Sequence, residues 1–552
     1  MWSHEDLFDI FRGNFPYYLL IAFPILLILS PMPVSGSVEF PVFRLQQFEL
    51  HGSTYGSQSS LVNVEARTLD SGSYARRCVL VRIKDLTPSL YHQLVNQGAA
   101  ALLILLPKSL NSLSLEHKEL IWELEEVLID TEVQMAVYLA YESAELTDIY
   151  DSVRTFTNTD SASSAAAALL SSLSSDGYQM VVGGSQSKKI SDSFIANIHG
   201  RLAGYGVEEQ LPTIAIVAHY DAFAAAPELA FGADSNGSGV VALLEIARIL
   251  SKLYSSVRTH PQKNILFLLS GGGFFNYQGS KRFLEDQLDA SDSPLLSEIE
   301  FALCLDTLTN GSSLNFHASR KPKENTPPFQ FYTALEEAGK QLGVNIEMIH
   351  KKINLKEDLQ SWEHEKYSMR KITAFTLSRL SNPKTGERGS LTDTFEVLNA
   401  TVLKERVAVI VAGLLKYIYN RPVDDLLAGG LSVTEDSINS WLSLLKSQPR
   451  STQMLSGKNN PFISSLHQIL SRYASEVKTA LNKADRRDPE WVFYDNWRSS
   501  MTAYAVKPAS FDFVLTLVIA AYLSVVYLFL QYFPRLFSFL YKLTATQRLK
   551  IN

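Results

Sequence analysis

The sequence PTIAIVAHYDAFAAAPELAFGADSNGSGVVALLE, residues 212–245, decides the fold. Its apolar run at 214–218 predicts a short buried strand, and the apolar spacing after the glycine-rich turn predicts a helix. His219 and Asp221 follow directly on the strand. Because a rigid strand fixes the position of a donor atom at its end, this arrangement is typical of a hydrolytic metal site.

The composition bounds the class of protein. The chain has 552 residues, of which 46% are hydrophobic, so it is long and apolar enough for two or more packed domains. Its formal net charge is −7 and it has no dense basic stripe, which argues against nucleic-acid binding. Cys78 and Cys304 lie in apolar, strand-like runs, so we expect both to be buried and unpaired.

Two apolar segments concern the membrane. Residues 513–533 carry no charge and are long enough to cross a bilayer core of about 30 Å, which predicts a transmembrane helix. The tail at 534–552 has basic residues and no acid, so we expect it in the cytosol. Residues 1–36 resemble a signal peptide, but their acidic start leaves an uncleaved N-terminal anchor open. The bulk of the chain is then lumenal or extracellular.

Alternating strands and helices predict an α/β fold with helices on both faces of a sheet. The Ser- and Ala-rich composition after residue 154 indicates a linker. The remaining boundaries follow from changes in pattern. We expect a small α/β lobe at 37–154, a linker at 155–189, the main domain at 190–423, a helical lumenal segment at 424–512, the transmembrane helix at 513–533 and the tail at 534–552.

Several motifs carry a resemblance to a known family. Residues of about 190–420 resemble the co-catalytic zinc aminopeptidases, a family that also includes glutamate carboxypeptidases and nicastrin. The match rests on AHYDAF, FGADSNGSGV, SGGGFFNYQG, LCLDT and SWEHE. With its terminal architecture, the whole chain resembles the membrane-anchored, nicastrin-like nicalin family. This implies a three-layer, aminopeptidase-like α/β sheet.

The same resemblance implies that the catalytic site is lost. Active relatives hold two zinc ions that share a bridging carboxylate and a nucleophilic water. His219 and Asp306 match two ligands, and Asp221 matches the acid that orients the histidine. Ser235 stands at the bridging acid, and its neutral hydroxyl cannot hold two cations together as a carboxylate does. Gly273 and Phe274 stand at the Glu-Glu pair and can neither bind zinc nor accept a proton from water, and Gly389 stands at the last histidine. A catalytic zinc needs about three protein ligands, so we expect a pseudoenzyme without metal or other cofactor.

The surviving residues then need structural roles. We expect His219 to be a hydrogen-bonded structural histidine, with a weakly bound single metal as the alternative. Asp221 and Asp306 are expected to cap helices or to accept backbone N–H bonds where loops begin. His364 and Glu365 fall near the position where the family closes its substrate pocket, and both a structural salt bridge and a residual ligand cleft stay open for them.

Three N-x-S/T sequons lie in the part expected to be lumenal, at Asn236, Asn310 and Asn399. Asn236 directly follows the lost bridging position. We therefore predict that Asn236 is glycosylated and that its glycan crowds the former metal cleft.

Three functions compete. The resemblance implies a single-pass scaffold subunit of an endoplasmic reticulum membrane complex, with partners of the nodal modulator family and transmembrane protein 147. It also implies work beside the Sec translocon and ribosome-associated insertion factors during insertion of multi-pass proteins, with an influence on Nodal-type signalling. The alternatives are a zinc peptidase that uses other ligands, and a nicastrin-like receptor that holds peptide termini in the vacant cleft.

Overall fold

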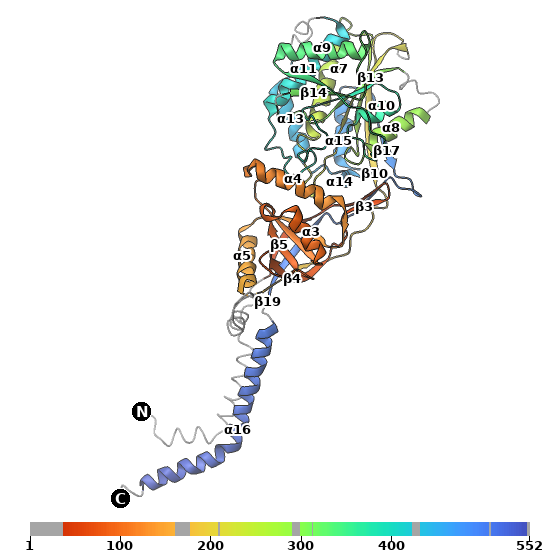
Figure 1. Cartoon of the computed structure of the whole chain (residues 1–552). Helices are drawn as coiled ribbons and strands as arrows, with labels where there is room; N and C mark the ends of the chain where they lie inside the picture. The colour runs from red at the N-terminus through yellow and green to blue at the C-terminus, as the bar shows by residue number, and fades with distance from the viewer. Residues whose placement is uncertain are drawn as a thin grey trace.

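The computed structural model describes residues 37–159, 177–207, 210–289, 298–311, 313–421, 431–506 and 509–548. Figure 1 shows three parts in a row: a large α/β domain, a smaller β-barrel lobe and the long helix α16 (Ala509–Arg548). The segment 1–36, predicted to be a signal peptide or an anchor, lies outside the described residues.

The large domain is built on an eight-stranded mixed sheet in the order β15-β14-β16-β13-β11-β12-β10-β17. Its central strand β11 pairs in parallel with β12 and β13, and all seven of its residues are buried. The strands are β10 (Phe194–Leu202), β11 (Thr213–His219), β12 (Asn264–Ser270), β13 (Ile299–Leu305), β14 (Ser313–Ala318), β15 (Asn345–His350), β16 (Ala374–Ser378) and β17 (Ser475–Lys483).

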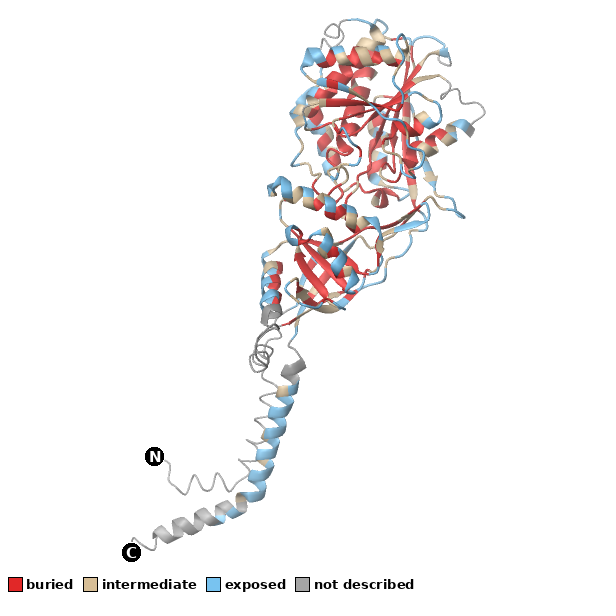
Figure 2. Ribbon diagram, viewed as in Figure 1, coloured by how far each residue is buried: buried red, intermediate tan, exposed pale blue. Residues whose placement is uncertain are grey.

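Helices cover both faces of this sheet. Ile214 and Ile216 of β11 pack against the helices of one face, whereas Ala215 and Val217 point to the other, because side chains alternate along a strand. The first face carries α7 (Gly237–Tyr254), α9 (Pro327–Leu342), α11 (Ala400–Tyr419), α13 (Glu435–Lys446) and α15 (Pro461–Leu470), and the second carries α8 (Gln278–Asp289) and α10 (His364–Met369). The predicted three-layer arrangement is confirmed, and Figure 2 shows the buried sheet at its centre.

The smaller lobe is a closed barrel in the order β1-β19-β9-β4-β5-β6-β8, and α3 (Pro88–Asn96), α4 (Leu115–Asp130) and α5 (Ala144–Thr159) surround it. A four-stranded sheet, β18-β2-β3-β7, is also formed beside it. The strands are β1 (Val38–Arg44), β2 (Gln47–Leu50), β3 (Ser53–Ser57), β4 (Val62–Thr68), β5 (Cys78–Arg82), β6 (Ala101–Leu106), β7 (Glu132–Val133), β8 (Ala136–Tyr141), β9 (Gly177–Val182), β18 (Trp491–Phe493) and β19 (Arg498–Val506). Cys78 and Cys304 are buried and free, as predicted.

The expectation of a helical segment over 424–512 is wrong for its second half. Helices α13, α14 (Thr452–Leu455) and α15 are present, but residues 475–506 form β17, β18 and β19. β17 and β19 are mostly polar and half exposed, so their own sequence pattern is weak and their pairing partners decide the conformation. The barrel also takes β9 from the predicted linker. It is therefore the barrel lobe, and not a helical spacer, that lies between the large domain and α16 (Figure 1).

Helix α16 contains the predicted membrane span. Phe513–Phe533 has a mean hydropathy of 2.5, and none of its most apolar window is buried against the rest of the chain. Figure 2 shows this stretch as an exposed rod. An isolated, exposed helix of 21 apolar residues is stable in a lipid bilayer and not in water.

The position of β19 generates a test with two truncations. A chain that ends at residue 508 keeps β19, whereas a chain that ends at 497 loses it. Since β19 pairs with both β1 and β9 and buries Met501 and Ala503 completely, its loss leaves two unpaired strand edges and an open core. We expect the 508 form to resist limited proteolysis and the 497 form to be degraded within the barrel lobe. Equal resistance of both forms would contradict the assigned topology.

Candidate functional site

The candidate site lies where β11, β12 and β13 end, because the loops that follow parallel strands meet at one edge of a sheet. His219, the last residue of β11, is completely buried. Its Nδ1 atom lies 3.5 Å from Glu363 Oε2 and 3.3 Å from Asn236 Nδ2. Burial alone lowers the pKa of His219, but the Glu363, Asp306 and Asp221 carboxylates outweigh it and raise the pKa. This histidine is therefore held as part of a buried charge network.

Asp221 organises the loop after β12. Its carboxylate accepts the Gly273 N–H at 3.0 and 3.1 Å and the Thr452 hydroxyl at 2.5 Å. Burial raises the pKa of Asp221 above its ordinary value. The residue that the resemblance assigned to orienting a zinc-bound histidine thus binds backbone and a hydroxyl group.

Arg388 supplies the cation of the site. Its guanidinium group donates to the Asp306 carboxylate and, at 2.9 Å, to the Tyr277 hydroxyl. The group lies 4.9 Å from the ring centre of Trp362 and 5.6 Å from that of Phe274. Burial by itself raises the pKa of Asp306, but the Arg388 charge, with that of His219, outweighs it and holds the pKa below its ordinary value. One of the two remaining ligand positions is therefore neutralised by a side chain of the same protein.

Three positions where the resemblance places missing zinc-site residues, Gly273, Phe274 and Gly389, are closely packed. A Cβ atom at Gly273 would lie 2.2 Å from His219 Cδ2, so no larger residue fits there without a shift. Phe274 stacks on Phe223 with 5.4 Å between ring centres. Gly389 has φ = +82°, and a Cβ atom there would lie 2.8 Å from the Phe274 ring. A glutamate pair and a histidine at these positions are incompatible with the packing that the chain has adopted.

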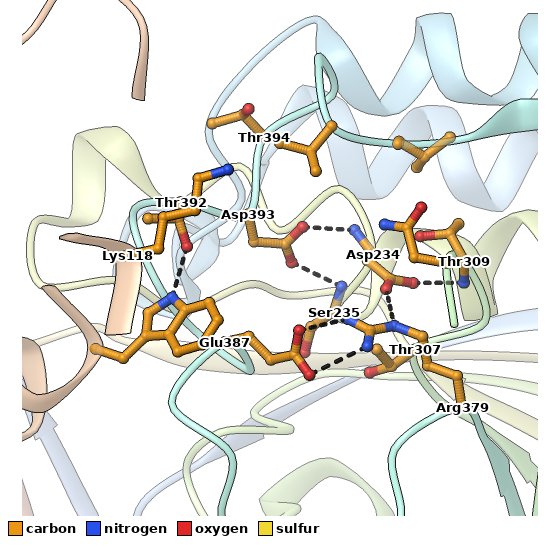
Figure 3. Close-up of a pocket in the computed structure, with 14 residues that line it drawn as sticks. Lys118, Asp234, Ser235, Thr307, Thr309, Arg379, Glu387, Thr392, Asp393 and Thr394 are labelled. Carbon is orange, nitrogen blue, oxygen red and sulfur yellow. Dashed lines mark hydrogen bonds and ion pairs between the residues drawn. The ribbon is translucent and has the colours of Figure 1, made fainter. Parts of the chain in front are cut away.

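The former bridging position borders a small cavity of about 80 Å³, shown in Figure 3. The Asp393 carboxylate accepts the N–H groups of Asp234 and Ser235, both at 2.8 Å. The Asp234 carboxylate accepts a hydrogen bond from Arg379 Nε at 2.8 Å, and Arg379 also forms an ion pair with Glu387. Burial beside Asp234 raises the pKa of Asp393. The acidic groups here are thus satisfied by backbone and by arginine.

Helix α4 of the barrel lobe covers this cavity. Trp122 Nε1 donates to the Thr392 hydroxyl at 2.8 Å, and a Cβ atom at Gly386 would lie 2.3 Å from Trp122 Cβ. Glu125 accepts the N–H groups of Leu391 at 3.0 Å and Ala225 at 3.1 Å, and burial raises its pKa to about 7. The lobe is therefore docked onto the loop that carries Arg388.

These residues do not fit a zinc ion. In the part of the chain that the structure describes, no group of three or more His, Cys, Asp or Glu side chains is placed to hold a metal. Asp306 is bound by Arg388, and His219 faces Glu363 and Asn236. A catalytic zinc requires about three protein ligands and a water. The arrangement supports charge pairing inside a packed core.

Sequence reasoning found part of this network and missed part. His364 and Glu365 do not reach His219: His364 Nδ1 pairs with the Thr376 hydroxyl at 2.8 Å, burial lowers its pKa to about 3, and both residues line a separate cavity of about 320 Å³. Their neighbour Glu363 is the residue that faces His219. No sequence motif marked Arg388 as a site residue, apart from its position next to Gly389.

The structure contradicts the predicted glycan on Asn236. This side chain is completely buried, and its Nδ2 atom, to which a glycan is attached, donates to the Leu305 carbonyl at 2.8 Å and the His219 carbonyl at 3.2 Å. Its Oδ1 atom accepts the Gly239 N–H and caps α7. Asn236 is thus a structural residue. Asn310 is partly exposed and Asn399 is exposed.

Comparison with known proteins agrees with the fold. The model of Peptidase family M28 matches residues 197–411. The crystal structure of nicastrin, a gamma-secretase component, superposes with a TM-score of 0.56 at 12% identity and covers 84% of this chain and 99% of its own. The large domain thus has the fold of an M28 peptidase.

Two relatives extend the match to the whole chain. The BOS complex subunit ncln of Danio rerio is 41% identical over 98% of both chains. Nicalin of Caenorhabditis elegans is 29% identical over 95% of this chain and 96% of its own. The chain belongs to the nicalin family.

The Arg388–Asp306 pair predicts a specific pattern of stability. Arg388→Met leaves the Asp306 charge buried without a partner and should lower the free energy of unfolding by about 3–5 kcal/mol. Adding Asp306→Asn removes that charge and should restore most of the loss. Urea unfolding of the purified full chain in detergent measures both, with the exposed Lys384→Met as control. Additive losses in the double variant would contradict the pairing.

The sequons provide a second test. Asn399→Gln should remove one glycan from the chain expressed in a secretory host, because Asn399 is exposed at the start of α11. Asn236→Gln should leave the glycan mass unchanged, since the folded chain buries that nitrogen. The mass shift on N-glycosidase treatment measures both. A shift that depends on Asn236 would show that the site is modified before the domain folds.

Proposed function

We propose that the chain is a membrane-anchored, non-catalytic subunit of the BOS complex. Its vertebrate relatives are named as subunits of that complex, and the match covers nearly the full length of each relative. The observation that carries the non-catalytic part is the buried ion pair between Arg388 and Asp306, which places a fixed organic cation on a residue that would otherwise bind zinc.

The chemistry supports this proposal. Loss of a general base alone typically lowers a rate by a factor of about 10²–10⁴. Here Gly273 and Phe274 stand at the expected Glu-Glu pair, and neither has a group that accepts a proton from water. With the metal ligands replaced as well, no route to an activated water is left at this edge of the sheet.

The proposed setting is the endoplasmic reticulum membrane, with the bulk of the chain in the lumen and the C-terminus in the cytosol. The apolar span of α16 and the basic residues after it support this orientation. The proposed partners are the nodal modulator protein and transmembrane protein 147, and the complex would act beside the Sec translocon and ribosome-associated insertion factors, with an influence on Nodal-type signalling. The resemblance to the nicalin family supports these assignments.

The two alternatives have less support. An active zinc peptidase needs a ligand set elsewhere, and the described residues offer none. A receptor for peptide termini at the former metal site needs an open cleft there, whereas the cavity at the former bridging position has only about 80 Å³ and α4 covers it. Pockets that bind small molecules usually measure about 300–1,000 Å³. The separate cavity of about 320 Å³ beside His364 and Glu365 is not lined by His219, Ser235 or Asp306.

The test uses the full chain purified from membranes in a mild detergent. We expect far less than one zinc per chain by elemental analysis, no aminopeptidase activity, and co-purification of membrane proteins that mass spectrometry identifies. A variant in which an unrelated transmembrane helix replaces 513–533 separates partners that bind the lumenal part from those that bind the span. Stoichiometric zinc together with activity that a chelator abolishes would overturn the proposal.

A further inference from the structure

A third cavity lies in the barrel lobe, and no residue of the former metal site lines it. It measures about 360 Å³, within the range of small-molecule pockets, and is lined mainly by charged side chains. Arg82 and Lys84 come from the end of β5 and the turn after it, Asp70 from the turn after β4, and Tyr150 and Arg154 from α5.

The strand directions place this cavity at the end of the barrel that faces α16. β19 ends at Val506, three residues before α16 begins. β9 is antiparallel to β19, β4 is antiparallel to β9, and β5 is parallel to β4, so β4 and β5 also end on the side where β19 ends. Figure 1 shows this end of the lobe next to the start of α16.

The same end lies close to the lipid headgroups. The apolar span begins at Phe513, four residues into α16, which corresponds to about 6 Å of helix. The headgroup layer on each side of a bilayer is roughly 5–8 Å thick. Once α16 spans the membrane, the cavity therefore faces the headgroup layer of the lumenal leaflet.

The charges in the cavity are mixed. The Arg82 guanidinium lies 4.8 Å from the ring centre of Tyr150. Its Nε atom forms an ion pair with Glu142 Oε1 at 3.3 Å, but the buried Nε–H makes no hydrogen bond. Arg154 pairs with Asp70 at 3.1 Å, but both side chains are about half exposed, and such pairs are weak and readily exchanged.

We propose that this cavity binds the headgroup of a zwitterionic phospholipid from the lumenal leaflet. The phosphate is an acceptor for Arg82, Lys84 and Arg154, and the ammonium group is a partner for Asp70 and Asp85. A purely anionic ligand would be repelled by the two carboxylates, and a purely cationic ligand would be repelled by the three basic residues. Only a ligand with both charges matches the lining.

The test titrates phosphatidylcholine into the full chain in detergent and counts bound lipids by native mass spectrometry. The double variant Lys84→Gln/Arg154→Gln should weaken the specific binding about tenfold, with roughly threefold for each exposed charge contact. The matched control is Arg370→Gln/Lys384→Gln, which removes two exposed, paired cations from the large domain. The control should bind like the unaltered chain. Equal binding by all three forms would mean lipid around α16 alone and would overturn the proposal.

A change of preference distinguishes the headgroup from a simple anion. Asp70→Asn/Asp85→Asn removes the carboxylates and should shift binding from phosphatidylcholine toward phosphatidylglycerol by about tenfold. Inorganic phosphate serves as a competitor and should not displace phosphatidylcholine at matched concentration. If the unaltered chain prefers phosphatidylglycerol, or if phosphate alone displaces phosphatidylcholine, the cavity is an anion site. Either result would overturn the proposal that it binds a zwitterionic headgroup.

Discussion

The buried charge of Asp306 is the constraint on which the site depends. A carboxylate at the end of a central strand cannot stay ionised in a packed core without a cation, because transfer of an isolated charge out of water is very costly. A metal ion meets that need in a peptidase. Here Arg388 meets it with a guanidinium group that also donates to Tyr277 and lies over two aromatic rings. The edge of the sheet thus keeps the Asp306 carboxylate, and an arginine side chain takes the place that a metal ion has in a peptidase.

Arginine serves in the same way around the rest of the site. Arg450 is completely buried and donates to the carbonyl groups of Tyr220, Phe231 and Gly232, so it holds the long loop after β11. Arg406 donates to the carbonyl groups of Leu308 and Gly311 in the loop after β13. A guanidinium group presents up to five donors in a fixed plane, which suits several acceptors at once. Loops that a peptidase keeps ready for substrate are here cross-linked by hydrogen bonds.

The sequence predicted features that rest on local pattern and missed those that rest on pairing. β11 and α7 were predicted because a continuous apolar run and helical spacing are visible in the sequence without a pairing partner. β17 and β19 were not, since their side chains are mostly polar and their conformation depends on β10, β1 and β9. Likewise the loss of zinc ligands could be read at Ser235 and Gly273. The pairing of Arg388 with Asp306 could not be predicted, because the two residues are 82 positions apart in the sequence and come together only in the folded chain.

The barrel also sets an order of events during synthesis. Its first strand, β1, begins at Val38, yet the neighbour that closes the ring, β19, begins at Arg498. The lobe therefore keeps an unpaired edge until the whole large domain has been synthesised. Closure becomes possible only when the residues just before α16 have emerged. In this chain the last strand to join the fold and the helix with the candidate membrane span are adjacent, so closure of the barrel and synthesis of that helix fall within the same short interval of translation.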